Sequence, residues 1–175
     1  ATISTGTALT RKLIAINGGS LEGRGIVNSH VTCAGAIAPE RWDAGGLAIN
    51  GNLTLAGSSV LSFDLGGTVK GMLYDSITQA SATPVTLAGA LAVQFTDGFE
   101  YCAHEADTFV LFTSNQDLQG SFVNALPGTR LTTSDGYGSF KVNYGPSSAF
   151  GPRTVVLSEF MTNLTAGPPL GQFAA

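Results

Sequence analysis

The chain has 175 residues and a formal net charge of −4, and 11% of its residues are charged against a usual ~25%. Its 43% hydrophobic content argues against intrinsic disorder. It has no basic cluster that could neutralise phosphates and no apolar run of about 18 residues, so we expect neither a nucleic-acid partner nor membrane insertion. A polar surface of Ser, Thr, Asn and Gln favours an extracellular or cell-surface location.

Alternation of apolar with small or polar residues dominates the chain from its first third onward. Successive side chains of a strand point to opposite faces, so each alternating run predicts a strand with one apolar face. The clearest runs are residues 53–55, 61–65, 85–95 and 140–144. Two further segments, 108–112 and 154–157, are apolar on both faces, which predicts strands covered on both faces.

Turn-forming pairs such as Asn50-Gly51, Asp97-Gly98 and Pro127-Gly128 separate these runs. No window has a convincing helical period, and residues 99–107 are the best helical candidate. We therefore predict one β-solenoid domain over residues 1–164. Residues 165–175, which include two prolines and two glycines, are expected to form a flexible tail.

A short motif recurs along the chain. The triplet Leu-x-Gly ends at Gly23, Gly57, Gly89 and Gly120, so it returns every 31 to 34 residues, and an apolar strand follows each copy. Solenoid proteins stack units of about 20–45 residues. The spacing predicts stacked strand repeats, with Gly89 filling an inward position between Leu87 and Leu91.

From Gly46 onward the chain resembles the repeat segments of bacterial autotransporter passengers and of surface proteins with autotransporter-associated β-strand repeats. The resemblance lies in the strand motifs of residues 46–55, 58–65, 74–77, 85–95, 107–111, 120–122, 140–144 and 155–157, which follow the family's order. It implies a right-handed parallel β-helix (β-solenoid) or its terminal cap, in segments that display, adhere or form scaffold. The predicted fold class is therefore all-β, with sandwich-like strand pairing as an option at the C-terminal end.

Carboxylates offer the best case for an enzyme, because polysaccharide-cleaving sites use acidic pairs. Asp64 and Asp75 are the most suggestive pair, followed by Glu105 and Asp107. Asp64 falls on the outward side of its strand and Asp75 follows a turn. We interpret all four as solvated surface acids and predict that the protein has no catalytic residue.

Metal and cofactor chemistry has little support in the sequence. The two histidines are His30 and His104, and the latter has only Cys102 as a second His or Cys near metal-ligand spacing. No Gly-x-Ser-x-Gly elbow and no phosphate-binding glycine loop occurs. We therefore expect neither a metal nor a cofactor.

The sequence leaves open whether the two cysteines form a disulfide and whether two asparagines are glycosylated. Cys33 and Cys102 permit one disulfide in an extracellular protein, or remain two separate thiols. Asn52 and Asn163 begin N-glycosylation sequons, which are relevant only in a eukaryotic source.

The function we expect is a non-catalytic structural or adhesive module that self-associates, as a surface or filament subunit, or contacts neighbouring repeats of a larger surface protein. The alternative is a carbohydrate-binding or polysaccharide-cleaving module with a glycan partner. That alternative needs exposed aromatic side chains beside paired acids on one face. The aromatic residues available are Trp42, next to Arg41 and Asp43, and the four tyrosines Tyr74, Tyr101, Tyr137 and Tyr144.

Overall fold

Strands account for all the long secondary structure of the described residues. The computed structural model describes residues 12–40 and 44–163, and within these ranges it contains sixteen strands and no α-helix. The predicted all-β class is confirmed. Of the helical candidate at 99–107, only a 3-10 turn, η1 (Phe99–Tyr101), forms. Across the described ranges, no helix has the length and apolar character needed to cross a bilayer.

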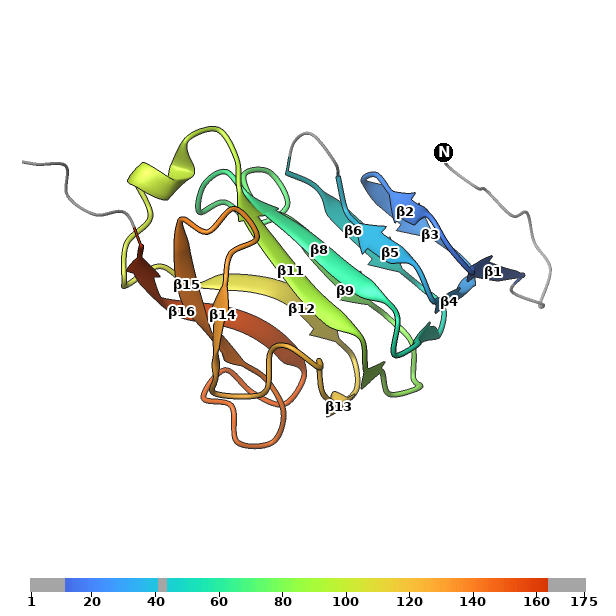
Figure 1. Cartoon of the computed structure of the whole chain (residues 1–175). Helices are drawn as coiled ribbons and strands as arrows, with labels where there is room; N and C mark the ends of the chain where they lie inside the picture. The colour runs from blue at the N-terminus through green and yellow to red at the C-terminus, as the bar shows by residue number, and fades with distance from the viewer. Residues whose placement is uncertain (1–11, 41–43, 164–175) are drawn as a thin grey trace, which may run out of the picture.

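Eleven of the first twelve strands lie in three parallel sheets, which the chain visits in rotation (Figure 1). The first sheet contains β1 (Leu13–Ile16), β4 (His30–Cys33) and β7 (Leu53–Leu55); the second contains β2 (Ser20–Glu22), β5 (Ala36–Ala38), β8 (Val60–Leu65) and β11 (Ala90–Phe95); the third contains β3 (Gly25–Val27), β6 (Gly46–Ile49), β9 (Ser76–Gln79) and β12 (Phe109–Ser114). Within each of these sheets, each strand pairs in parallel with the strand three places later. Strand β10 (Thr86–Leu87) does not pair with β7; it pairs in parallel with β13 (Gln119–Gly120) in a separate two-stranded sheet. The two intervening strands supply the crossover that a parallel pair needs.

The core consists of alternate side chains stacked from strand to strand. In β8 and β11 the register places Leu61 beside Leu91 and Phe63 beside Val93, and all four side chains are buried. Between them the outward positions carry small or polar residues such as Ser62. The alternation in residues 53–55, 61–65 and 85–95 therefore predicted the inward faces correctly.

The prediction of a structural repeat with a fixed length of 31 to 34 residues is wrong. Leu55 and Leu87 both end strands that precede a strand of the second sheet, but Leu21 lies inside that sheet, in β2. The offset between paired strands also grows along the chain, because Ala36 pairs with Ser20 and with Val60, and Val60 pairs with Ala90. Strand register does not depend on the length of the connection, so strands stay paired although the connections between them differ in length.

The chain changes to antiparallel pairing at its C-terminal end. Strands β14 (Arg130–Thr132), β15 (Gly138–Asn143) and β16 (Thr154–Thr162) extend the third sheet in the order β14-β15-β16-β12. Where the sequence suggested sandwich-like strand pairing, the structure has an antiparallel extension of the third sheet. This extension lies at the left of Figure 1. The predicted tail at 165–175 lies outside the described residues.

A β-bulge in β16 directs an aromatic side chain over this end of the core. Glu159 has a φ of 51°, and the pairing with β15 shifts register between Ser139 and Lys141. The extra residue turns Phe160 inward, where its ring centroid lies 4.9 Å from that of Phe140 and 5.5 Å from that of Phe95. Phe109 joins the cluster at 5.6 Å from Phe140. The four rings cover the end of the core.

Polar groups cover the free edge of β11 at the same end. The Leu91 N–H donates to Asn124 Oδ1 at 2.9 Å, and the Asn124 amide donates back to the Leu91 carbonyl at 2.9 Å. The Ser134 N–H donates to the Val93 carbonyl at 2.7 Å, and the Phe95 N–H donates to Asp135. We call this part of the molecule, residues 121–163, the closed end.

The opposite end of the three sheets has no comparable cover. Within residues 12–40 and 44–163, no strand pairs with the outer edge of β1, β2 or β3, which lie together at the right of Figure 1. We call these three strands the open end.

Candidate functional site

The longest connections of the parallel region gather at one corner, between the second and third sheets. They span residues 39–45, 66–75 and 96–108, whereas the turns from the first to the second sheet span only 34–35, 56–59 and 88–89. Loops placed by a rigid scaffold often carry function. This corner and the sheet face beside it are therefore the first place to look for a site.

A groove of about 250 Å³ crosses the outward face of the second sheet next to this corner. Its floor contains Ala36 and Ala38, whose small side chains leave the face hollow. Its polar lining consists of Ser20, Glu22, Glu40, Ser62, Asp64 and Gln94. The groove thus collects three carboxyl groups from different strands and connections.

Asp64 lines this groove but is shielded from solvent. It occupies an outward position of β8 and is only 4% exposed. The register places Gln94 beside it, and the Gln94 side chain hydrogen-bonds to its carboxyl group. Burial raises the pKa of Asp64, and the Gln94 hydrogen bond offsets part of that rise.

Asp75 is completely buried directly behind the groove. Its Oδ1 accepts the Gly45 N–H at 2.7 Å and its Oδ2 accepts the Asp64 N–H at 2.9 Å. Burial raises the pKa of Asp75 to about 7; the two N–H donors oppose this rise, and the negative charges of Asp64 and Glu40 add to it. The carboxyl group therefore links the 39–45 connection to β8.

The prediction that Asp64 and Asp75 are solvated surface acids is wrong. Alternation correctly placed Asp64 on the outward face, but it could not show that neighbouring side chains and connections cover that face. The structure does bring the two residues together. Both oxygens of Asp75 contact backbone donors, however, and Asp75 does not line the groove, so the pair does not form two carboxyl groups facing a substrate space.

Glu105 and Asp107 lie in the 96–108 connection and do not line the groove. Asp107 Oδ2 accepts the His104 N–H at 2.8 Å, which is a local turn contact. His30 is engaged elsewhere, because its Nδ1 accepts the Asn52 N–H at 2.9 Å. Across the described part of the chain, no three or more His, Cys, Asp or Glu side chains are grouped to hold a metal ion.

The two cysteines are free thiols, so the disulfide that the sequence permitted is not formed. Cys33 is buried in the core, where burial raises the pKa of its thiol, while Cys102 is exposed after η1. Cys33 points inward from β4 and Cys102 belongs to a surface connection. Sequence spacing alone could not reveal that difference.

The aromatic residues do not form a row. Tyr74 and Tyr144 are buried at 4% and 2% exposure, and only Tyr101 and Tyr137 of the four tyrosines are exposed. Trp42, with Arg41 and Asp43, lies outside the described residues. The exposed platform expected of a sugar-stacking face is therefore not built from these tyrosines.

The two sequon asparagines make different contacts. Asn52 is partly buried, and its Oδ1 accepts the Ser81 hydroxyl at 2.6 Å. Asn163 is exposed and donates from Nδ2 to the Gly136 carbonyl at 3.2 Å. Both amides contribute to turns, and their modification stays a prediction.

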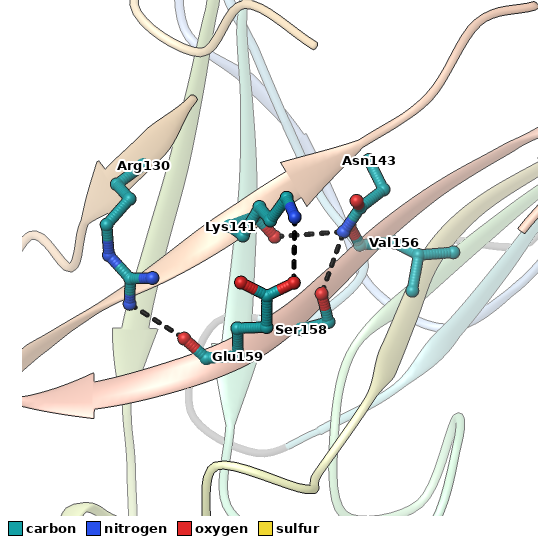
Figure 2. Close-up of polar contacts among 6 residues, drawn as sticks. All are labelled: Arg130, Lys141, Asn143, Val156, Ser158 and Glu159. Atoms are coloured by element: carbon teal, nitrogen blue, oxygen red, sulfur yellow. Dashed lines mark hydrogen bonds and ion pairs between the residues drawn. The ribbon is translucent and has the colours of Figure 1, made fainter. Parts of the chain in front are cut away.

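A polar network on β14, β15 and β16 is structural (Figure 2). Arg130 donates to the carbonyls of Ser139 and Glu159 at 2.7 Å each, and so holds both sides of the bulge. The Glu159 carboxylate pairs with Lys141 at 2.8 Å, and Asn143 donates to the Ser158 hydroxyl at 2.9 Å. These groups satisfy one another, so the network stabilises the closed end and does not form a binding site.

No protein-family model, curated protein or solved structure matches the chain. Function is therefore argued from the chemistry and geometry of the chain itself.

Proposed function

We propose that this chain is a non-catalytic structural or adhesive module of an extracellular surface protein, built as a parallel β-solenoid with a terminal cap. The observation that supports it most is the parallel pairing of strands three places apart within three sheets. A right-handed coil is favoured because parallel crossovers are almost always right-handed. The resemblance to autotransporter-associated repeats agrees with this arrangement.

The corner between the second and third sheets is the proposed adhesive surface. Its connections expose large apolar side chains: Val69 at 47%, Met72 at 69%, Leu73 at 45% and Tyr101 at 72%. Scattered exposed apolar residues are common, but these four occur in two long connections at one corner. A scaffold that holds such loops away from its core suits display and adhesion better than catalysis.

A paired assay tests this function. The purified chain is applied to surfaces coated with matrix proteins or polysaccharides, and the release of reducing ends from the same polysaccharides is measured. We expect retention without turnover, and retention should weaken in Met72→Asp but not in Asp64→Asn. Turnover that disappears in Asp64→Asn or Glu40→Gln, but not in the loop control Glu105→Gln, would show that the protein is an enzyme.

The groove supports a second candidate, a carbohydrate-binding module. Its hydroxyl, amide and carboxyl groups can hydrogen-bond a sugar, and its volume of about 250 Å³ could hold one ring. Ser62→Arg should fill the groove and abolish binding on a glycan array. Thr54→Arg, at an exposed position on the first sheet, is the matched control. Binding that survives Ser62→Arg excludes the groove as the site.

A further inference from the structure

The connection of residues 66–75 folds back onto the end of β8. The Gly66 N–H donates to the Leu73 carbonyl at 2.7 Å, and the Asp75 N–H donates to the Asp64 carbonyl at 2.9 Å. These two bonds run between the start and the end of the connection, as they would in a hairpin. They fix the base of a loop whose middle exposes three of the four apolar side chains of the proposed adhesive surface.

The carboxyl group of Asp75 completes this fold-back from the inside. Its Oδ2 accepts the Asp64 N–H at 2.9 Å, so Asp75 bonds both the N–H and the carbonyl of Asp64. Its Oδ1 accepts the Gly45 N–H at 2.7 Å, directly before β6 begins. One carboxyl group therefore holds the base of the connection against strands of the second and third sheets.

Two acidic side chains share this enclosed space without a neutralising cation. Asp75 is fully buried and Asp64 is only 4% exposed. Among the described residues, neither carboxyl group forms a salt bridge. The Lys70 ammonium of the same connection donates to the Thr113 hydroxyl at 3.2 Å, and the further charge that acts on Asp75 is that of Glu40, which is also acidic. Ionising both carboxyl groups therefore costs free energy in the folded corner.

The pKa of Asp75 agrees with this geometry. Burial raises it to about 7 from 3.8; the two N–H donors oppose the rise, and the charges of Asp64 and Glu40 add to it. A raised pKa means that the stabilising proton is fully bound at low pH and is lost as pH approaches 7. When the corner opens to water, Asp75 regains its ordinary pKa, so opening becomes easier as pH rises.

We propose that Asp64 and Asp75 form a pH-sensitive clasp, which holds the 66–75 connection in place while one carboxyl group is protonated and lets it open more often once both are ionised. This inference rests on the proposed adhesive function of the corner, because the connection carries most of that surface. Retention on a surface should therefore be stronger at pH 6 than at pH 8.5.

Limited proteolysis with trypsin measures how often the clasp opens, because Lys70 is the only lysine or arginine of the connection. A peptide of residues 66–75, digested in the same buffer, corrects for the pH dependence of trypsin itself. We expect the ratio of protein cleavage to peptide cleavage after Lys70 to rise about tenfold from pH 6 to pH 8.5. Cleavage after Arg130, in β14 of the closed end, reports unfolding of the whole domain and should be slower than cleavage after Lys70 at both pH values.

Three substitutions assign the effect to the clasp. Asp75→Asn should make the cleavage ratio independent of pH, because the amide does not titrate in this range. Asp64→Asn should make the rise smaller, because the Asp64 charge helps to raise the pKa of Asp75. Asp107→Asn is the matched control in the neighbouring connection: its carboxylate also accepts a backbone N–H, that of His104, and the variant should keep the tenfold rise. Circular dichroism checks that each variant keeps a β-rich spectrum, and Asp64→Asn carries the test if Asp75→Asn unfolds.

Retention on coated surfaces is measured at the same two pH values. A cleavage ratio that stays constant with pH, equal cleavage after Lys70 and Arg130, or a lost rise in Asp107→Asn would overturn the clasp. Equal retention at both pH values, despite a rising ratio, would overturn its role in adhesion. If the ratio rises but the chain is retained at neither pH, the clasp stands and the proposed function fails; if the chain is retained while the ratio stays constant, the proposed function stands and the clasp fails.

Discussion

The two ends of the parallel sheets differ in how the chain covers their outer strand edges and core side chains. Every stack of parallel strands ends in unpaired backbone groups and a half-covered core. At the closed end, the chain adds three antiparallel strands, four packed phenylalanines and side-chain partners for the β11 backbone. At the open end, glycine occupies an inward position, and among the described residues Ile14, Leu21 and Val27 are only partly buried. In this chain, the end that is covered is the one where the pairing changes from parallel to antiparallel.

The largest difference between the ends should appear in core truncations. Phe140 is 1% exposed and contacts Phe95, Phe109 and Phe160, so Phe140→Ala should lower the free energy of unfolding by about 3–5 kcal/mol. Ile14→Ala, at the open end, should lower it by about 1–2 kcal/mol because Ile14 is half-buried. Urea unfolding of dilute protein measures both. Equal losses would mean that the open end is as well packed as the closed end.

The free energy of unfolding should depend on pH through Asp75, which lies at the corner between the second and third sheets and not at either end. The pKa of Asp75 is raised to about 7 from 3.8, so between these pH values the folded state holds a proton that the unfolded state has released. Its contribution to stability is therefore complete at low pH and is lost as pH rises from about 4 to about 7, by up to about 4 kcal/mol.

Asp75→Asn isolates this effect, because the amide does not titrate in that range. Unfolding free energies at pH 4, 5.5 and 7.5 should show a smaller decline with pH in the variant than in the parent chain. A decline of the same size in both would assign the pH dependence to other groups.

A glycine in a tight turn should tolerate substitution less well than a glycine with open space around it. Gly89 has a φ of +71°, and an added Cβ would lie 2.1 Å from the Ser59 carbonyl oxygen. Its place is therefore a corner turn and not the inward position that the alternation suggested. Gly89→Ala should cost about 1–3 kcal/mol. Gly57→Ala, where a Cβ would meet nothing within 4 Å, should stay within about 0.5 kcal/mol. Similar melting temperatures for the two variants would contradict this account.

The smallest expected effect comes from uncovering one strand edge at the closed end. Asn124→Ala removes both hydrogen bonds to Leu91 and should cost about 1–2 kcal/mol. Hydrogen exchange of the Leu91 amide should accelerate toward the rate of an open edge. The control Asn28→Ala removes a bond between two exposed side chains, Asn28 and Asn50, and should have almost no effect. An unchanged Leu91 rate would show that other groups protect β11.

The sequence predicted the strands and their inward faces because side-chain alternation is a local property of the backbone. Residues 61–65 and 85–95 alternate, and the large apolar side chains among them are buried, as is Asp64 on the outward face. The acidic groove could not be predicted in the same way. Its lining residues come from four strands and one connection, and the pairing register of strands far apart in the sequence determines their alignment.

By itself, the sequence determined the all-β class, the positions of most strands and the low charge of the surface, because each depends on local pattern or composition. Only the tertiary structure decided that Asp64 and Asp75 are buried, that Cys33 and Cys102 are separate, and that one end is closed while the other is open. Each of these depends on which segments lie beside one another after the chain has turned through three sheets. Local alternation carries no information about that arrangement.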